Sequence, residues 1–140
     1  MNYLLDTCVL SEYVKKQPQQ KVLEWLDEQD EESLFISVLS IGEIEKGIVK
    51  QKLLNPSRGQ KLAIWLEKVE QRFAKRILSI YINIMREWGA LCIQSESHGI
   101  KLPVIDSLLI ATARCYQLTV VTRNIHDFDK FSKVYNSWEE

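Results

Sequence analysis

Four acidic side chains stand out because of where they fall along the chain. Asp6 directly follows an apolar run at the N-terminus, and Glu43 lies shortly after a second apolar run. Asp106 stands in the first turn of a strongly apolar predicted helix, and Asp127 follows the clearest predicted strand. In open α/β sheets, ligand sites lie beyond the carboxyl ends of the strands. Carboxylates gathered there could hold a metal ion, whose chemistry includes the activation of water.

Each of these residues could instead have an ordinary structural role. Asp6 is a good N-cap for the helix after it, and Ser40 with Glu43 has the spacing of a capping box. Asp106 would complement the helix dipole from the first turn, and Asp127 would fit a polar turn. The structural role is weakest for Asp106, because a carboxylate at the start of an enclosed helix needs a partner.

A cation is the partner that would let these carboxylates share one crevice. Without it they repel each other and raise one another's pKa. Oxygen donors with no Cys or His pair favour Mg²⁺ or Mn²⁺ over zinc. The three cysteines, Cys8, Cys92 and Cys115, are far apart and form no CxxC pair. They therefore indicate neither a zinc site nor a redox dithiol, and a reduced intracellular protein is the simplest interpretation.

A pattern of short strands separated by helices would position the acidic residues. The predicted strands span 3–5, 34–37, 77–78, 118–122 and 134–135. Apolar residues at helical spacing predict helices that include 9–14, 22–26, 38–48, 62–73, 81–98 and 104–115. Asn55-Pro56 is a typical helix start. Strands that alternate with helices imply parallel pairing through crossovers. The predicted fold class is therefore α/β, a three-layer α/β/α sandwich with a short, mostly parallel central sheet.

The length of the chain and its apolar runs set limits on its organisation. At 140 residues and 16.4 kDa, residues 1–140 have the size of a single domain. No apolar run approaches the roughly 20 residues that a membrane span needs. The N-terminal sequence MNYLLDT also lacks the features of an export signal. We therefore expect a cytoplasmic protein.

The formal net charge of −1 conceals an uneven distribution. Residues 1–45 carry 3 basic and 10 acidic side chains, residues 46–76 carry 9 and 2, and residues 77–140 carry 6 and 7. The basic middle segment could bind a polyanion or an acidic partner, or it could form solvated helix faces. The near-neutral total therefore does not exclude a nucleic-acid partner.

Four segments, distributed over essentially the whole chain, have the order and spacing of one family. They are LLDT at 4–7 with Val9 and Ser11-Glu12, SVLSIGEIEKG at 37–47, LPVIDSLLIATA at 102–113, and VTRN at 121–124. With these segments the chain resembles the PIN-domain ribonucleases, specifically the VapC-type toxins of bacterial toxin–antitoxin pairs. The resemblance implies a PIN-like fold, an RNA substrate, a homodimer and a small antitoxin protein that blocks the site.

The resemblance also implies that Asp6, Glu43 and Asp106 are three of four acidic residues that bind one or two divalent cations. Many relatives have Asp at the fourth position, directly after Thr-Arg. This chain has Asn124 there, with Asp127 three residues later. Asn124 could ligate through its carbonyl oxygen, or Asp127 could complete the site. Either residue set carries less negative charge, so the number of metal ions stays open.

The chemistry implied by this residue set is hydrolysis of RNA phosphodiesters. The reaction needs a nucleophilic water and neutralisation of the charge that develops on phosphate, and a carboxylate-held metal supplies both. Asp6 and Asp106 would ligate the metal directly. Glu43 would ligate through water or act as the general base. Thr7 and Thr122 would be supporting hydroxyls that hold carboxylates or a water in place.

Basic residues near these motifs could bind the substrate. Arg123, Arg114 and the basic stretch 46–76 are candidate phosphate contacts. Arg114 could instead be the polar edge of its helix. The basic stretch could equally bind an acidic partner.

Two other functions compete with the ribonuclease prediction. A haloacid-dehalogenase-like phosphatase or a receiver is disfavoured, because Asp6-Thr7-Cys8 lacks the second Asp two residues on, and no adjacent acidic pair lies near the N-terminus. A catalytically weak or inactive PIN-like module that binds RNA or protein is the other alternative. Asn124 is the feature that favours this alternative.

Overall fold

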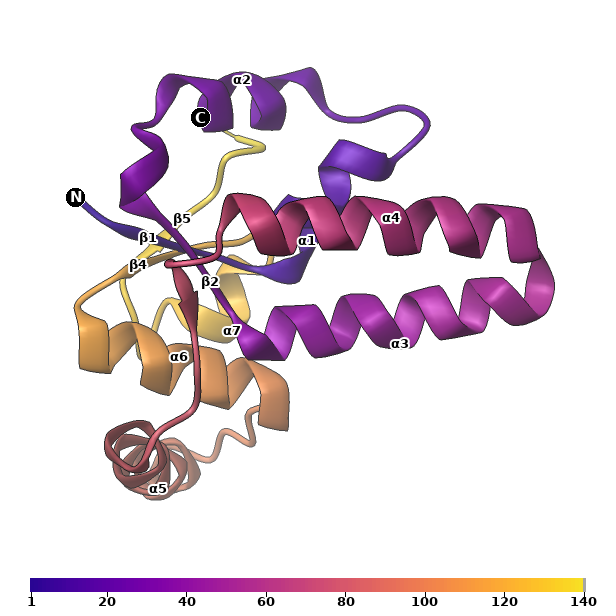
Figure 1. Ribbon diagram of the computed structural model, residues 1–140. Coiled ribbons are helices and arrows are strands. Elements are labelled where there is room, and N and C mark those ends of the chain that lie inside the picture. The colour runs from indigo at the N-terminus through magenta and orange to yellow at the C-terminus, as the bar shows by residue number, and fades with distance from the viewer. Residues whose placement is uncertain (140) are drawn as a thin grey trace.

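The computed structural model describes residues 1–139 and is built around a five-stranded parallel sheet (Figure 1). Its strands are β1 (Tyr3–Leu5), β2 (Leu34–Ser37), β3 (Ile77–Leu78), β4 (Thr119–Val121) and β5 (Val134–Tyr135). They lie in the order β3-β2-β1-β4-β5, and each neighbouring pair is parallel. The α/β prediction is confirmed, and every predicted strand is present.

Helices occupy the segments that connect these strands. In the described part of the chain they are α1 (Thr7–Ser11), the 3₁₀ helix η1 (Glu12–Val14), α2 (Gln20–Glu28), the 3₁₀ helix η2 (Glu31–Ser33), α3 (Val38–Leu54), α4 (Pro56–Arg72), α5 (Ile82–Ser97), α6 (Val104–Tyr116) and α7 (Ile125–Phe128). Buried residues of α1 to α4 pack on one face of the sheet, and those of α5 to α7 pack on the other. This arrangement is the expected three-layer sandwich (Figure 1).

The central strand β1 shows why both faces are covered. Leu4 and Leu5 are fully buried, but they belong to opposite apolar clusters. Val120 and Val121 of β4 divide between the two clusters in the same way. Successive side chains of a strand point to opposite faces, so a run that is apolar at every position needs helices on both sides.

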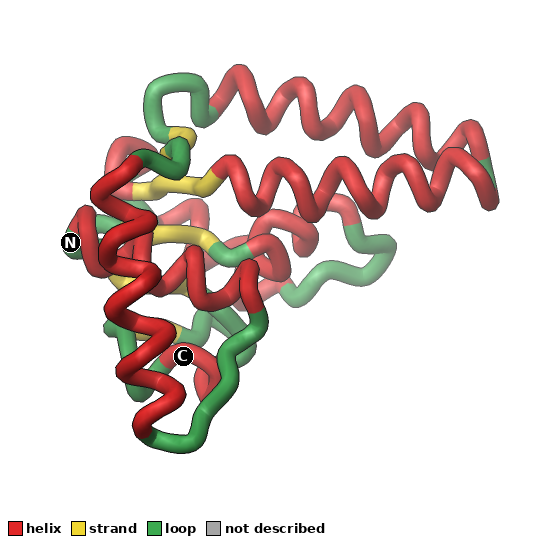
Figure 2. Tube along the Cα trace, turned by 90° about the horizontal axis from the view of Figure 1, so that it is seen from below, coloured by secondary structure: helices red, strands yellow, loops and turns green. Residues whose placement is uncertain are grey.

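The helices α3 and α4 form a long hairpin that extends beyond the sheet (Figure 1 and Figure 2). Asn55 begins α4 as predicted, because its side-chain oxygen accepts the backbone N–H of Arg58 at 3.2 Å, with Pro56 next. Near this turn the two helices touch closely at Gly59. A Cβ there would lie only 2.8 Å from the backbone nitrogen of Lys52, so the contact requires glycine.

Two of the alternative structural roles are not found in the structure. The Ser40–Glu43 capping box does not form, because β2 runs directly into α3, which begins at Val38, two residues before Ser40. Ser37 caps α3 instead, with its Oγ accepting the backbone N–H of Leu39 at 3.0 Å. The segment containing Asp127 is not a simple polar turn but the short helix α7, which the fully buried Phe128 anchors in the core.

The predictions for the two helices before β4 are confirmed. The helix predicted over 81–98 spans Ile82–Ser97, and Gly99 follows it with a φ of 71°, a conformation that favours glycine. The helix predicted over 104–115 spans Val104–Tyr116 and buries six of its residues. Among residues 1–139, none of the helices has the length and apolar character needed to cross a membrane.

Candidate active site

Asp6 lies where β1 ends and is held by hydrogen bonds to two segments. Its Oδ1 accepts the backbone N–H of Thr7 at 2.8 Å, and its Oδ2 accepts the Oγ1–H of Thr122 at 2.8 Å. Only 6% of the residue is exposed. The Asp6 backbone N–H also donates to Val121 at 2.9 Å, which brings the carboxyl ends of β1 and β4 together. Asp6 is therefore the N-cap of α1 and also a fixed carboxylate at the edge of the sheet.

Glu43 reaches the same region from the second turn of α3. Thr7 Oγ1 donates a hydrogen bond to Glu43 Oε1 at 2.6 Å, and the Thr7 oxygen also lies 3.0 Å from Ser40 Oγ. Ser40 is fully buried, whereas Glu43 is exposed. The predicted supporting role of Thr7 thus has a direct geometric basis, because one hydroxyl joins the start of α1 to the carboxylate on α3.

Asp106 stands in the first turn of α6, where it is partly buried. Its pKa is raised to about 6, first by burial and then by the negative charges of Asp6, Asp127 and Glu43. The start of α6 is fixed to α5, because Ser107 Oγ accepts the Trp88 Nε1–H at 2.8 Å and donates to the Val104 carbonyl at 2.6 Å. The raised pKa shows that the other three predicted carboxylates are close enough to repel Asp106.

The last motif follows β4, and Thr122 connects it to β1. The Thr122 hydroxyl, which donates to Asp6, also accepts the backbone N–H of Asn124 at 3.0 Å. Asn124 then begins α7, and its backbone carbonyl accepts the N–H of Asp127 at 3.1 Å. Both side chains are exposed at this edge. Asp127 acts on Asp106 through its charge, so the structure brings all four predicted acidic residues to one region.

This region has the donor chemistry of a hard divalent cation. Within residues 1–139, no three acidic, His or Cys side chains already lie close enough together to enclose a metal ion. A cation bound among the four carboxylates would remove the repulsion that raises the pKa of Asp106. Because the gathered side chains offer oxygen donors, they fit Mg²⁺ or Mn²⁺.

The family is decided by comparison with known proteins. Residues 3–134 match the model of the PIN domain. The chain belongs to the PIN-domain family. The segments that carried the resemblance in the sequence lie inside this match, and the elements that they form meet at the edge of the sheet described above.

Relatives of this PIN domain match it from end to end. Toxin FitB of Neisseria gonorrhoeae is 32% identical over 142 residues, covering 98% of this chain and 99% of FitB. VapC ribonuclease Y4jK of Sinorhizobium fredii is 28% identical over 141 residues and 97% of each chain. The crystal structure of FitAcB from Neisseria gonorrhoeae has a TM-score of 0.92 at 31% identity and covers 99% of each chain. The resemblance to VapC-type proteins is thus confirmed.

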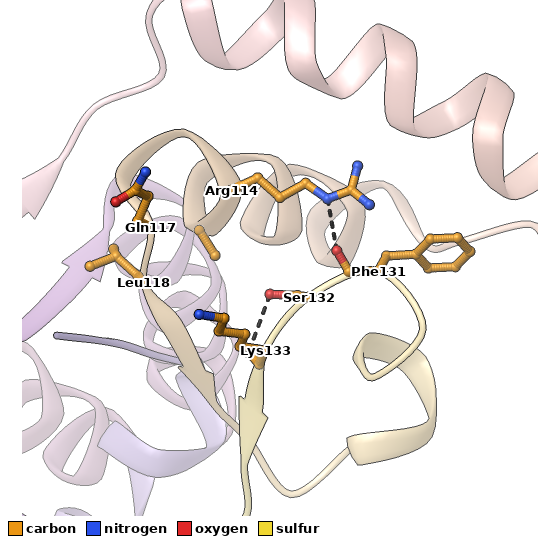
Figure 3. Close-up of a pocket in the computed structure, with 7 residues that line it drawn as sticks. Arg114, Gln117, Leu118, Phe131, Ser132 and Lys133 are labelled. Carbon is orange, nitrogen blue, oxygen red and sulfur yellow. Dashed lines mark hydrogen bonds between the residues drawn. The ribbon is translucent and has the colours of Figure 1, made fainter. Parts of the chain in front are cut away.

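The two predicted substrate-binding arginines occupy different parts of the PIN domain. Arg123 follows Thr122 at the carboxyl edge, with its guanidinium 5.7 Å from the centre of the Trp138 ring. Arg114 lies eight residues after Asp106 on α6, about 12 Å further along the helix axis. Its Nε donates to the Phe131 carbonyl at 2.7 Å (Figure 3), and its Nη atoms reach Glu87 and Gln94. The structure therefore does not bring Arg114 to the acidic region.

The sequence predictions gave no site role to Cys8. Its Sγ lies 3.6 Å from Asp6 Oδ2 and 4.0 Å from Thr122 Oγ1. Burial first, and then the charge of Asp6, raises the pKa of the Cys8 thiol to about 11. The thiol is therefore neutral near pH 7 and adds no charge beside Asp6. Its position directly after the Asp6-Thr7 pair was the available signal.

Glu12 was also overlooked as a buried charge close to the edge. It is fully buried, its Oε1 accepts the backbone N–H of Gln19 at 2.9 Å, and its Oε2 lies 2.5 Å from Lys15 Nζ. Burial favours the neutral acid, but Lys15, the Gln19 N–H and the charge of Arg123 outweigh burial and lower the pKa of Glu12. Ser11-Glu12 belongs to the first family segment, which was the signal in the sequence.

Proposed function

We propose that this PIN domain is a Mg²⁺- or Mn²⁺-dependent endoribonuclease and the toxin of a toxin–antitoxin pair. The observation that carries the proposal is the position of Asp106 at the carboxyl edge of the sheet, where the charges of Asp6, Asp127 and Glu43 all act on it. A cation bound among these carboxylates would relieve the repulsion and keep Asp106 ionised. The similarity to a VapC ribonuclease over nearly the whole chain supports RNA as the substrate.

Asp6 and Asp106 are the proposed direct metal ligands, with Asp127 or the Asn124 carbonyl completing the set. When bound, the metal supplies neutralisation of phosphate charge and a more acidic attacking water. Thr122 holds Asp6 in one orientation by its 2.8 Å hydrogen bond. The whole acidic set has four carboxylates when Asp127 completes it and three when Asn124 does, so the number of bound ions, one or two, stays open.

Glu43 is the proposed general base, or a ligand through water. As general base, its carboxylate accepts a proton from the attacking water. Thr7 aims this carboxylate through the 2.6 Å hydrogen bond and so limits its rotation. Arg123 is the proposed phosphate contact, since it directly follows Thr122, whose hydroxyl donates to Asp6. Arg114 remains a weaker candidate, because its donors already have protein partners.

The proposed partners are a small antitoxin protein and a second copy of the chain. Structural relatives include a toxin–antitoxin complex from Klebsiella pneumoniae and a FitAB complex bound to a DNA fragment. The homodimer rests on the family resemblance. RNA as the substrate places the proposed action in the cytoplasm. Co-expression with the product of a neighbouring small gene, followed by purification of a complex, tests the antitoxin. The molar mass in solution tests the dimer.

Cleavage of RNA with titrated Mg²⁺ or Mn²⁺ tests the activity. We expect cleavage to require the metal and to be lost in Asp6→Asn. Glu45→Gln is the matched control, because it removes a carboxylate two residues from Glu43 that is exposed and has no ion pair among residues 1–139. Sequencing the 5′ ends produced in cells would identify the RNA that is cut. Equal cleavage by parent and Asp6→Asn would refute the metal site.

The alternative is a catalytically weak or inactive module that binds RNA or protein. Asn124 favours it, because a neutral residue at the fourth acidic position reduces the charge available to hold a metal. An active enzyme should lose cleavage in Asn124→Ala or Asp127→Ala, whichever residue completes the site. An inactive module should bind RNA without cutting it, and Asn124→Asp should then create or strongly increase cleavage.

A further inference from the structure

A groove beside Glu43 separates the start of the chain from the α3–α4 hairpin. Its volume is about 380 Å³. Thr7 and Glu43 line one end, and Lys50 and Arg58 line it further along. Glu43 and Lys50 are seven residues apart on α3, which corresponds to about 10 Å along the helix. The groove therefore begins at the proposed catalytic region and continues away from it.

Three cations line this groove, and two of them are available to a ligand: Lys15 pairs with the buried Glu12, whereas Lys50 and Arg58 do not pair with an acidic residue within residues 1–139. Two of the nine cations in residues 46–76, Arg72 and Arg76, pair with Glu31. In the described part of the chain, Lys50 has no ion pair and is exposed. The guanidinium of Arg58 donates one hydrogen bond, from Nη2 to the Val14 carbonyl at 3.2 Å, although a guanidinium has five N–H donors. Glu43 is the acidic residue that lines the groove, at its catalytic end.

A second, independent feature of the groove is Gly47. It lies in the middle of the 17-residue helix α3 and lines the groove. A glycine inside a helix is destabilising relative to alanine. Packing does not explain it, since a Cβ built at Gly47 would meet nothing within 4 Å. Glycine at such a place allows a ligand to approach the helix backbone closely.

We propose that this groove holds the single-stranded RNA that flanks the scissile phosphate. The inference rests on the proposed ribonuclease function and extends it to the path of the substrate. The strand passes over the bare surface at Gly47, and Lys50 and Arg58 bind its phosphates a few nucleotides from Glu43. The apolar residues of the lining, which include Leu62 and Trp65, contact the bases without reading their sequence.

RNA is favoured over an acidic protein because of the groove's position. Its lining includes Thr7 and Glu43, so an occupant of the groove also reaches the groups proposed to act on the phosphodiester. A substrate of the proposed nuclease must have chain on at least one side of the cleaved bond. Unpaired cations aligned next to that bond match the regular charge of a nucleic-acid backbone.

Binding of a single-stranded RNA of about 12 nucleotides tests the path. The full-length chain carries Asp106→Asn throughout, so that the probe stays intact, and fluorescence anisotropy is measured over a range of salt concentrations. Lys50→Ala should weaken binding several-fold and reduce the slope of log K against log salt by about 0.7. Lys61→Ala, an exposed lysine on α4 outside the groove lining, is the matched control and should change neither quantity.

A steric variant tests the path without changing charge. Gly47→Gln should weaken RNA binding several-fold with little change in the salt slope, because it fills the groove and removes no cation. Gly89→Gln is its control, since Gly89 is also exposed, within α5, and has equal space for a Cβ. Thermal unfolding of both variants checks that the fold is intact.

The two kinds of measurement test the RNA path through the groove and the proposed nuclease function separately. Magnesium-dependent cleavage by the parent tests the nuclease, and the binding series tests the groove even if no cleavage occurs. If Lys50→Ala and Gly47→Gln bind the RNA as tightly as their controls, the path is wrong, whether or not the parent cuts. If these variants lose binding to an acidic protein partner but keep RNA binding, the groove belongs to that partner and the proposal is also overturned.

Discussion

Charged side chains at the two ends of the parallel sheet differ in whether they have partners of opposite charge. At the carboxyl edge, Asp106 is repelled by three other carboxylates, and its pKa is raised to about 6. At the other end, a larger cavity of about 580 Å³ is lined by Arg114, Leu118 and Lys133 (Figure 3). There Arg114 has a partner at each of its three nitrogens.

This contrast shows that the size of a cavity is a poor guide to chemistry in this fold. The larger cavity lies where β4 and β5 begin, beside an arginine whose charge the protein itself satisfies. At the carboxyl edge, none of the four carboxylates has an ion pair within residues 1–139. An uncompensated charge indicates a ligand more directly than empty volume does.

The most severe test of this contrast compares the loss of activity caused by one substitution at each end of the sheet. Asp106→Asn should lower magnesium-dependent RNA cleavage by more than about 100-fold, because even residues that only orient metal ligands cost 10- to 100-fold. Arg114→Ala should keep kcat within a few-fold of the parent. Initial rates on one RNA measure both. If Arg114→Ala loses activity and Asp106→Asn does not, the assignment of the chemistry to the carboxyl edge is wrong.

The hydroxyl that orients Asp6 should have the next largest effect. Thr122→Val removes the 2.8 Å hydrogen bond to Asp6 Oδ2 with little change in shape, and we expect a loss of about 10- to 100-fold at limiting Mg²⁺. Excess Mg²⁺ should restore part of the rate. Thr119→Val is the matched control, since Thr119, at the start of β4, is buried as Thr122 is but has no side-chain hydrogen bond within residues 1–139. Equal rates for both variants would remove Thr122 from the site.

At the opposite end the expected effect is on stability. Arg114→Ala removes three hydrogen bonds and a partly exposed ion pair to Glu87, so the free energy of unfolding should fall by about 1–3 kcal/mol. Urea denaturation measures the change. Lys133→Ala, an exposed residue of the same cavity, should change stability by less than about 0.5 kcal/mol. An Arg114→Ala variant with an unchanged free energy of unfolding would mean that the interactions of Arg114 do not stabilise this end of the sheet.

The smallest expected effect is a gain in stability at the carboxyl edge. A carboxyl group whose pKa is raised in the folded state binds its proton more tightly folded than unfolded. Asp106 therefore lowers stability as pH rises from about 4 to about 6, and its full cost remains at pH 7. Asp106→Asn should stabilise the metal-free protein by about 1 kcal/mol near pH 7, after allowance for solvent screening, and hardly at all near pH 4.

Thermal unfolding in a chelator at both pH values measures this difference. Added Mg²⁺ should then stabilise the parent more than Asp106→Asn, because the ion binds the folded state and needs the carboxylate. A parent that is as stable as the variant at pH 7 without metal would show that the carboxylates do not repel one another.

The strands and the acidic residues were predictable because their signals are local. An apolar run followed by Asp6, or by Ser37 and an apolar stripe, defines both a strand and the point where it ends. Two features depended on tertiary contacts. Ser40 and Glu43 have the spacing of a capping box, yet β2 continues into α3 without a break and Ser37 caps the helix. The position of Arg114 depends on Phe131 and Glu87, which are far from it in the sequence.

The close contact at Gly59 has a consequence for how such proteins can diverge. Because α4 rests there against the backbone of Lys52, one residue near the turn sets the spacing of the two long helices. A larger side chain would displace the wall that carries Arg58 and Trp65, while every acidic residue kept its place. A lineage could thus change the shape of the groove proposed to hold RNA through a position that lies outside both the groove lining and the acidic region.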